Sequence, residues 1–294
     1  MSALKGILGY LVTPFGESGR GIDADILRIT VDHLIDGGVD GVAPLGSTGE
    51  SAYLTDDEWR EVVEVTISQV AGRVPTVVGV SALTTEKTTR FAVLAEELGA
   101  DALMVLPISY WKLSEDEILT HYAAVSDAVS LPIMAYNNPV TSGIDMSPEL
   151  LVRMVMAIEN VTMIKESSGD IRRMHALREL SDDTIPFFNG CNPLALEALC
   201  AGAGGWCTAA PNLIAGLNIA LWEAVCEDRL DDGRDCFYKQ LPILRFILSK
   251  GLPATVKAGL KLQGIDAGTP RLPLKPLDEE TVAELAALMA AAAS

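Results

Sequence analysis

The sequence predicts an α/β fold, a (β/α)8 TIM barrel followed by a helical C-terminal extension. The first observation is that short apolar runs alternate with longer amphipathic stretches, and this unit repeats eight times. The second is length, because one barrel of this type fills about 250 residues of a chain that has 294. The third is a recurring pattern of helix end, glycine and strand start, found at Gly37 to Val42 and at Leu98 to Leu103. A doubly wound parallel sheet is the alternative fold.

The apolar runs have the length of buried strands. In chain order the predicted strands are Ile7 to Val12, Gly41 to Leu45, Thr76 to Val80, Ala102 to Leu106, Pro132 to Tyr136, Val161 to Lys165, Ile185 to Asn189 and Gly205 to Thr208. A helical segment follows each of them. These segments are Ala24 to Gly37, Thr55 to Ala71, Thr84 to Leu98, Ser114 to Ala128, Ser147 to Ala157, Ile171 to Leu180, Pro193 to Ala201 and Ala215 to Arg229. Right-handed crossovers would then bring every strand's carboxyl end to one face of the barrel.

Helix start signals support several of these assignments. Thr55 and Ser114 each precede a glutamate by three residues, which is the capping-box pattern, and Ser147 precedes a proline in the first turn. The segment from Ala198 to Trp222 has no charged residue and is long enough to raise the question of a membrane span. Its glycines, asparagines and Pro211 divide it, so we expect two packed elements there.

No strand signal follows Arg229. Helical segments are predicted at Asp231 to Lys250, Pro253 to Gly264 and Asp278 to Ala293, with a proline-rich linker before the last of them. We therefore expect a barrel over residues 1–229 and a helical extension over residues 230–294.

The charge balance excludes some classes of partner. There are 22 Lys and Arg residues against 40 Asp and Glu, a formal net charge of −18, and no run of four basic residues. Binding to nucleic acid or to an anionic membrane surface is therefore not expected, whereas a small anion can still bind locally. The N-terminus has no basic segment followed by an apolar stretch, so we expect no secretory signal and a cytoplasmic enzyme.

Cysteine and histidine usage argues against disulfides and a metal site. The five cysteines include no CxxC pair, and the three histidines are widely separated. A structural disulfide and a zinc site are both unexpected.

Reactive side chains follow two neighbouring predicted strands. The sixth strand runs directly into Lys165, and the fifth ends at Tyr136. Burial among apolar walls disfavours an ammonium ion and favours a free amine that can attack a carbonyl group, which is Schiff-base chemistry. Because adjacent strands lie about 4.8 Å apart, Tyr136 would be within reach to relay protons. Spacing alone does not exclude, and taken singly favours, a lysine at the barrel rim paired with Glu166 and an ordinary half-buried tyrosine.

A third candidate lies after the second strand, in the turn from Gly46 to Ser51, with sequence GSTGES. Its glycines flank the hydroxyl side chains of Ser47 and Thr48. Such a turn can direct backbone N–H groups and hydroxyl donors at a carboxylate, although a turn of this composition is also common as a simple connection.

Together these segments resemble the dihydrodipicolinate synthase and N-acetylneuraminate lyase family. The matching motifs are GSTGES at Gly46 to Ser51, YNNP at Tyr136 to Pro139 and IKESSGD at Ile164 to Asp170. The resemblance extends from about Gly6 to the C-terminus and includes Gly190. It implies a (β/α)8 barrel with a helical extension, a usually tetrameric assembly described as a dimer of dimers, no metal or organic cofactor, and a lysine Schiff base with a 2-oxo acid.

The resemblance also implies roles for individual residues. Lys165 would form the imine, and Tyr136 would shuttle protons. Ser47 and Thr48, with Gly49 of the same turn, would bind the substrate carboxylate, and Thr48 would help to relay protons. Tyr110 matches a tyrosine that reaches across a dimer interface to complete the relay. Cys207 occupies the position on the eighth strand where a main-chain carbonyl contributes to the substrate site.

One departure bears on the second substrate. Synthases and neuraminate lyases carry an arginine shortly after the tyrosine, whereas this chain has Thr141. In synthases that arginine holds the carboxylate of the incoming aldehyde, so its loss predicts a less polar or shorter second substrate. The segment from Asn189 to Pro193 also departs from the acidic residues with which neuraminate lyases bind sugar hydroxyls.

We therefore expect a lyase that forms a Schiff base with pyruvate or another 2-oxo acid and makes or breaks a carbon–carbon bond. The same enamine could instead expel hydroxide or an amine, so a dehydratase or deaminase of a 2-keto-3-deoxy sugar acid or of hydroxypyrroline carboxylate is an alternative. A non-catalytic paralogue that binds a 2-oxo acid is a third hypothesis.

Overall fold

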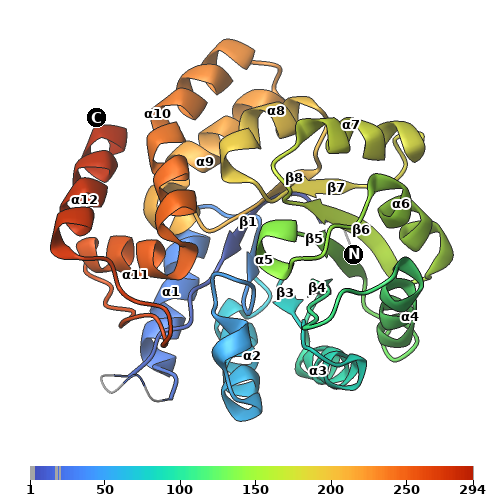
Figure 1. Cartoon of the computed structure of the whole chain (residues 1–294). Helices are drawn as coiled ribbons and strands as arrows, with labels where there is room; N and C mark the ends of the chain where they lie inside the picture. Colours follow the sequence, from blue (N-terminus) through green and yellow to red (C-terminus); the bar gives the residue numbers. More distant parts are fainter. Residues whose placement is uncertain (1–3, 17–18, 20, 294) are drawn as a thin grey trace.

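Eight parallel strands form a barrel in the computed structural model, which describes residues 4–16, 19 and 21–293. The strand order is β2-β1-β8-β7-β6-β5-β4-β3, and a parallel bridge between Val42 and Thr76 joins the two end strands. The predicted TIM barrel is thus confirmed (Figure 1). The strands are β1 (Gly6–Tyr10), β2 (Gly41–Ala43), β3 (Val77–Gly79), β4 (Ala102–Val105), β5 (Ile133–Asn137), β6 (Val161–Glu166), β7 (Phe187–Asn189) and β8 (Gly205–Thr208).

Helices surround this barrel. Those that connect and follow the strands are α1 (Ala24–Asp36), α2 (Asp56–Val70), α3 (Thr85–Leu98), α4 (Glu115–Ser126), α5 (Pro139–Ser142), α6 (Pro148–Ala157), α7 (Ile171–Leu180), α8 (Ala195–Cys200) and α9 (Pro211–Cys226). Short 3-10 turns occur at η1 (Ser51–Tyr53) and η2 (Asn192–Leu194). The capping boxes predicted at Thr55 and Ser114 are present.

Two elements differ from the prediction. The short helix α5 was not expected; Asn138 caps it by accepting a hydrogen bond from the backbone N–H of Thr141, and Pro139 occupies its first turn. Helix α9 begins at Pro211, four residues before the predicted start, because a kink at Ile214 joins a proline-led first turn to the longer helix. The uncharged segment thus contains β8 and most of α9. Across the described ranges, no helix combines the length and apolarity that a membrane span requires.

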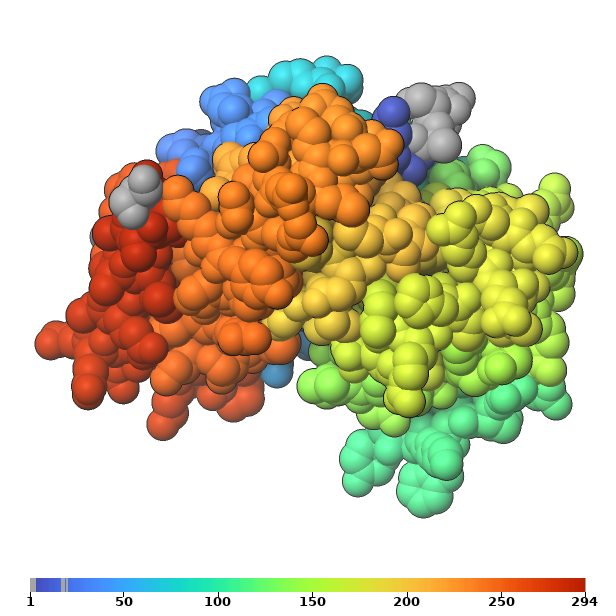
Figure 2. Space-filling view, turned by 90° about the horizontal axis from the view of Figure 1, so that it is seen from above, coloured from blue at the N-terminus to red at the C-terminus, as the bar shows by residue number. Residues whose placement is uncertain are grey.

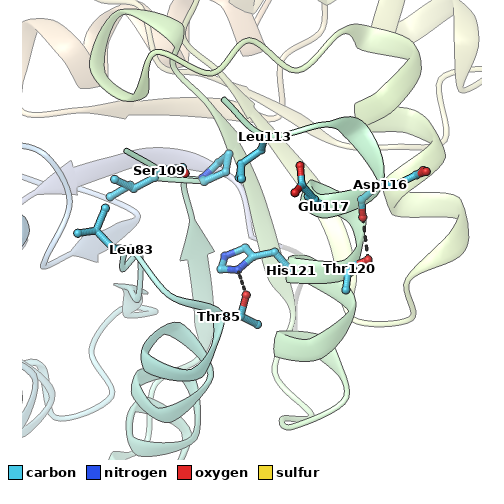
Figure 3. A pocket seen from close by; sticks show the side chains of 10 residues that line it. Leu83, Thr85, Ser109, Leu113, Asp116, Glu117, Thr120 and His121 are labelled. Atoms are coloured by element: carbon cyan, nitrogen blue, oxygen red, sulfur yellow. Dashed lines mark hydrogen bonds between the residues drawn. The ribbon is translucent and has the colours of Figure 1, made fainter. Parts of the chain in front are cut away.

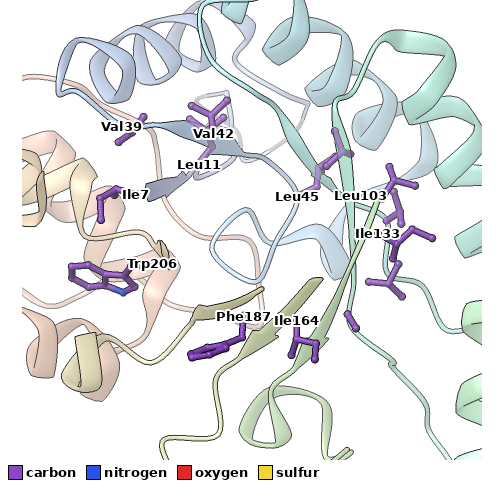
Figure 4. Close-up of a cluster of buried hydrophobic side chains, with 14 of the residues drawn as sticks. Ile7, Leu11, Val39, Val42, Leu45, Leu103, Ile133, Ile164, Phe187 and Trp206 are labelled. Carbon is purple, nitrogen blue, oxygen red and sulfur yellow. The ribbon is translucent and has the colours of Figure 1, made fainter. Parts of the chain in front are cut away.

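Strand residues alternate between two apolar layers, as the two-residue period of a strand requires. One layer lies between the strands and the helices, and Figure 4 shows Ile7, Ile133, Ile164 and Trp206 pointing outward into it. The other fills the barrel interior. Its members come from the neighbouring strand positions and include Leu8, Tyr10, Met104, Met134, Phe188 and Cys207. Because Ile164 points outward, the next residue along β6 points inward.

The C-terminal extension lies against one side of the barrel, coloured orange to red in Figure 2. It consists of α10 (Leu230–Lys250), α11 (Leu252–Leu262) and α12 (Glu279–Ala293). A buried polar contact joins it to the barrel, since Asn218 Nδ2 of α9 donates to Gln240 Oε1 of α10 over 2.6 Å. The segment between α11 and α12 returns to the barrel, where Arg271 forms two hydrogen bonds with the Glu58 carboxylate at the start of α2, at 2.7 and 2.8 Å.

This pair predicts a pH-dependent contribution to stability. The hydrogen bonds from Arg271 lower the pKa of Glu58 from 4.5 to about 2. Because the folded-state pKa is depressed, the stabilisation is present above pH 4.5 and is lost as the pH falls towards 2. Glu58→Gln should lower the free energy of unfolding by about 1 to 2 kcal/mol at pH 7 and by progressively less below pH 4.5.

Urea unfolding at several pH values measures this difference. Glu64→Gln on the same helix is the matched control, because its ion pair with Arg60 is about half exposed and should contribute less than about 0.5 kcal/mol. An equal effect of Glu58→Gln at pH 7 and pH 3 would contradict the assignment.

Candidate functional site

Lys165 lies at the end of β6 and points into the barrel mouth. It is only 4% exposed, and its Nζ lies 3.7 Å from the ring centroid of Tyr136 and 4.1 Å from that of Tyr10. Lys165 Nζ lies 3.9 Å from the Met104 sulfur. Within the described part of the chain, no carboxylate forms a salt bridge with it. The amine is therefore held by aromatic faces rather than by a counter-ion.

Glu166 does not pair with Lys165, so the alternative of a rim lysine is wrong. The next residue of a strand faces the opposite way, and the Glu166 carboxylate lies buried outside the barrel, where Arg173 Nε donates to it over 3.1 Å. Asn137 Nδ2 donates to the same carboxylate, and Asn137 Oδ1 accepts from the backbone N–H of Met146. Arg173 also donates to the Met146 carbonyl. This network fixes both ends of the segment 138–145.

Tyr136 is the direct neighbour of Lys165 across the β5–β6 pair, where the two residues are register partners. The predicted proximity of the two side chains is thus present. The Tyr136 hydroxyl accepts a hydrogen bond from Asn138 Nδ2 over 2.7 Å. Because this bond uses an acceptor position of the oxygen, the phenolic proton is left to donate elsewhere.

The turn from Gly46 to Ser51 has a strained backbone. Leu45 and Glu50, on either side of its centre, are non-glycine residues in the left-handed region, with φ of 62° and 55°. Gly49 is required by close approach, because a Cβ there would lie 3.0 Å from the Leu45 backbone nitrogen. The Gly49 N–H donates to the Gly46 carbonyl, and its own carbonyl accepts from the Thr13 hydroxyl at 2.6 Å. Gly49 thus shapes the turn, and its N–H is already engaged.

A cavity of about 410 Å³ brings most of the predicted residues together. Ser47, Thr48, Tyr136, Lys165 and Cys207 all line it. Among the described residues that line the cavity, Lys165 is the only one with a charged side chain. Thr48 is buried and Ser47 is half-buried. The turn that carries both residues forms one wall of the cavity.

A further part of the cavity lining, called the apolar wall, is uncharged and largely apolar. It comes from the segment after β5, the segment after β7 and the junction of α10 and α11, and it includes Val140, Thr141, Asn192, Leu248 and Leu252. A substrate part lying against this wall meets a hydroxyl, an amide and aliphatic carbon.

Cys207 lies on β8 with its side chain in the barrel interior. Burial raises the pKa of its thiol, which keeps the sulfur protonated and weakly nucleophilic at neutral pH.

Sequence reasoning missed several residues around the lysine. Tyr10 and Met104 form the amine's surroundings. The predicted strands run past both residues, to Val12 and Leu106, whereas β1 ends at Tyr10 and β4 at Val105, so a search for polar strand ends does not reach them. Every second side chain of a strand points into the barrel, and this two-residue period is the signal that could have identified them. Gly190, which the resemblance included, also lies against the lysine, since a Cβ there would lie 2.7 Å from Lys165 Cε and 1.8 Å from Ser167 Oγ.

Tyr110 is separate from this cavity within one chain. Tyr110 is 95% exposed, and the neighbouring Trp111 is 78% exposed. A role for Tyr110 at the site would therefore require a second copy of the chain.

A second cavity, of about 370 Å³, lies between α3 and α4 (Figure 3). Thr85 Oγ1 and His121 Nδ1 are hydrogen-bonded at 2.9 Å on its wall, and burial lowers the pKa of His121. None of the predicted site residues lines this cavity. The barrel mouth around Lys165 is therefore the candidate active site.

Comparison with known proteins decides the family. The model of the Dihydrodipicolinate synthetase family matches residues 3–292. This chain belongs to that family. Similar curated proteins are the 4-hydroxy-tetrahydrodipicolinate synthases of Methanopyrus kandleri, 31% identical with 95% of this chain and 93% of the relative covered, and of Thermomicrobium roseum, 35% identical with 93% and 90% covered. Relatives named as synthases of this kind are lyases, and so is this member of the family.

Solved structures agree with this assignment. A Pseudomonas aeruginosa protein, provisionally named a dihydrodipicolinate synthetase, is 57% identical, with a TM-score of 0.97 over 99% of this chain and 100% of its own. The dihydrodipicolinate synthase of Thermotoga maritima is 29% identical, with a TM-score of 0.94 over 98% of both chains.

Proposed function

We propose that this lyase forms an imine between Lys165 and the ketone carbon of a 2-oxo acid, with pyruvate as the candidate, and makes or breaks a carbon–carbon bond. The observation that carries the proposal is the Lys165 amine, buried against two aromatic rings in the cavity and without a carboxylate partner among the described residues. An amine kept out of water and free of a counter-ion is suited to attack a carbonyl group.

The site offers a physical route through the reaction. Attack by Nζ gives a carbinolamine, and loss of water from it needs a proton donor, which the Tyr136 hydroxyl supplies. The protonated imine is a cation, and the faces of Tyr10 and Tyr136, at 4.1 and 3.7 Å from Nζ, stabilise positive charge there. This cation withdraws the electron pair released when the C3–C4 bond of the substrate breaks, giving an enamine.

The Ser47–Thr48 turn would bind the carboxylate of the 2-oxo acid. Both residues line the cavity that contains Lys165, and a chain with a net charge of −18 needs local donors to hold an anion. Cys207 would contribute through its position on the cavity wall rather than as a nucleophile.

The apolar wall favours a second substrate that has no carboxylate where it lies against this wall. Thr141 lies there in place of the arginine of the synthases, and the wall carries no charged side chain among the residues described. A shorter or less polar aldehyde would therefore be accepted more readily than an anionic one. Elimination of hydroxide or an amine from the same enamine would leave the carbon chain intact, so product analysis separates a dehydratase or deaminase from an aldolase.

Mass spectrometry after incubation with pyruvate and borohydride tests the imine directly. We expect a reduced pyruvyl adduct on the peptide that contains Lys165. Reversible binding of pyruvate without a reducible adduct, in folded protein, would favour a non-catalytic binding protein instead.

We further propose that the enzyme is a homo-oligomer, a dimer of dimers, in which Tyr110 of one copy reaches its neighbour's site. Two adjacent aromatic side chains left 95% and 78% exposed are typical of an interface. Trp111→Glu should dissociate this contact and lower activity by roughly tenfold or more. Sedimentation at several protein concentrations measures the assembly, and a wild-type monomer with full activity would contradict the proposal.

A further inference from the structure

The carboxylate-binding turn ends on a buried ion pair with the C-terminal extension. Lys257 Nζ, on α11, lies 2.8 Å from Glu50 Oε1, and the two side chains are 1% and 0% exposed. Glu50 follows Ser47, Thr48 and Gly49 directly and has the strained φ of 55°. The pair therefore joins the candidate substrate-binding turn to a helix from the other end of the chain.

Further contacts from the extension hold this pair in place. The other Glu50 oxygen, Oε2, accepts from the backbone N–H of Arg271 over 2.7 Å, and Lys257 Nζ also donates to the Thr269 carbonyl over 3.1 Å. The Phe15 ring lies against both cations, 4.1 Å from Lys257 Nζ and 4.2 Å from the Arg271 guanidinium carbon. One Glu50 oxygen is thus hydrogen-bonded to the extension, and the other is ion-paired with it but accepts no hydrogen bond from the described residues.

A buried carboxylate at this position creates an electrostatic problem for the proposed reaction. Glu50 is two residues from Thr48, which would bind the substrate carboxylate, and it lines an adjoining cavity together with Ser47 and Tyr136. A like charge in such a partly buried site repels that carboxylate. We propose that Lys257 is a positioning residue for 2-oxo acid binding. It neutralises Glu50 and fixes the turn, so that Ser47 and Thr48 can bind the substrate carboxylate. This inference rests on the proposed function and assigns a part in it to the C-terminal extension.

Stability alone is a poor explanation for the pair. Removing two charges from water is expensive, and an apolar pair of similar volume often stabilises a fold as well or better. Burial lowers the pKa of Lys257, which shows that the site is costly for its cation, and the Glu50 carboxylate opposes that shift.

Titrating pyruvate in the borohydride trapping reaction tests the proposal. Lys257→Met should raise the half-saturating pyruvate concentration by about tenfold, because it leaves Glu50 uncompensated, while the amount trapped at saturation stays unchanged. The double variant Glu50→Gln with Lys257→Met removes both charges and should restore the half-saturating concentration to within about threefold of wild type. Methyl pyruvate, which carries no charge, should be trapped equally by wild type and Lys257→Met.

The matched control is Lys261→Met, one helical turn further along α11. Its ion pair with Asp266 is exposed and does not involve the Ser47–Thr48 turn. It should leave trapping unchanged. If circular dichroism shows that Lys257→Met does not fold, the test compares Glu50→Gln with the double variant instead. Glu50→Gln leaves an unpaired cation near the turn, so it should bind pyruvate more tightly than the double variant does.

The outcomes separate the two proposals. An unchanged half-saturating concentration in folded Lys257→Met, an equal rise in the single and double variants, or an equal loss for pyruvate and methyl pyruvate would overturn the role of Lys257 alone. No adduct in wild type would overturn the proposed function and this inference with it.

Discussion

Lys165→Arg is expected to reduce turnover by at least about 10⁴-fold and to abolish borohydride trapping. Arginine retains the positive charge and much of the length of lysine, but its guanidinium stays protonated and does not act as a nucleophile at neutral pH. The variant therefore tests whether activity requires imine formation at this residue or only a positive charge there. Since the pocket around Nζ consists of two aromatic faces and a thioether, the larger guanidinium also finds no carboxylate there to bind.

Steady-state turnover of the substrate identified by screening, together with peptide mass spectrometry, measures this loss. Lys250→Arg, at the exposed end of α10, is the control for general effects of the exchange and should keep wild-type activity. Activity of the Lys165→Arg variant above about 1% of wild type would mean that the covalent step does not occur at this residue.

Tyr136→Phe should lower turnover by about 10² to 10⁴-fold, the range typical of a lost general acid or base. The ring remains over Nζ, so the substitution removes only the hydroxyl. Imine formation should slow, but prolonged incubation with borohydride should still label Lys165. A rapid-quench time course of trapping distinguishes a slow step from a missing one.

Tyr10→Phe is the matched control, because it removes a second hydroxyl from the same pocket. The Tyr10 hydroxyl donates to the Met104 sulfur over 2.9 Å, and burial raises the pKa of Tyr10, so its proton is both engaged and hard to remove. Its loss should change turnover by less than about tenfold. Equal losses in the two variants would show that the two hydroxyls contribute alike and that Tyr136 has no separate role as the proton donor.

Periodicity along the chain was sufficient to predict the barrel. Alternating apolar positions distinguish the two faces of each strand, and this places Lys165 inside once Ile164 is outside. The candidate site was predictable where reactive groups follow a strand, as at Tyr136 and Lys165. Helix α5 was missed because four residues are too few for helical periodicity to appear.

Contacts between distant segments could not be predicted in this way. The pair of Glu50 and Lys257 joins two ends of the chain, and no local pattern relates a glutamate in a turn to a lysine on a late helix. Tyr10 was missed for a different reason, because the predicted strand ran on to Val12 and so made Tyr10 an ordinary core residue.

The bonds that hold Asn137, Met146 and Glu166 together have a consequence for how new enzymes of this type could arise. The residues between Asn137 and Met146 include Val140 and Thr141 of the apolar wall. Asn137 at one end donates to the Glu166 carboxylate on the outer side of the barrel, and its Oδ1 accepts from the backbone N–H of Met146 at the other end. The sequence of this segment can therefore change while its two ends stay fixed. Evolution, or an engineer, can change the residues that follow Asn138 to admit a different aldehyde, while Asn138 keeps its hydrogen bond to the Tyr136 hydroxyl and the proposed imine site on the inner side of the same two strands stays in place.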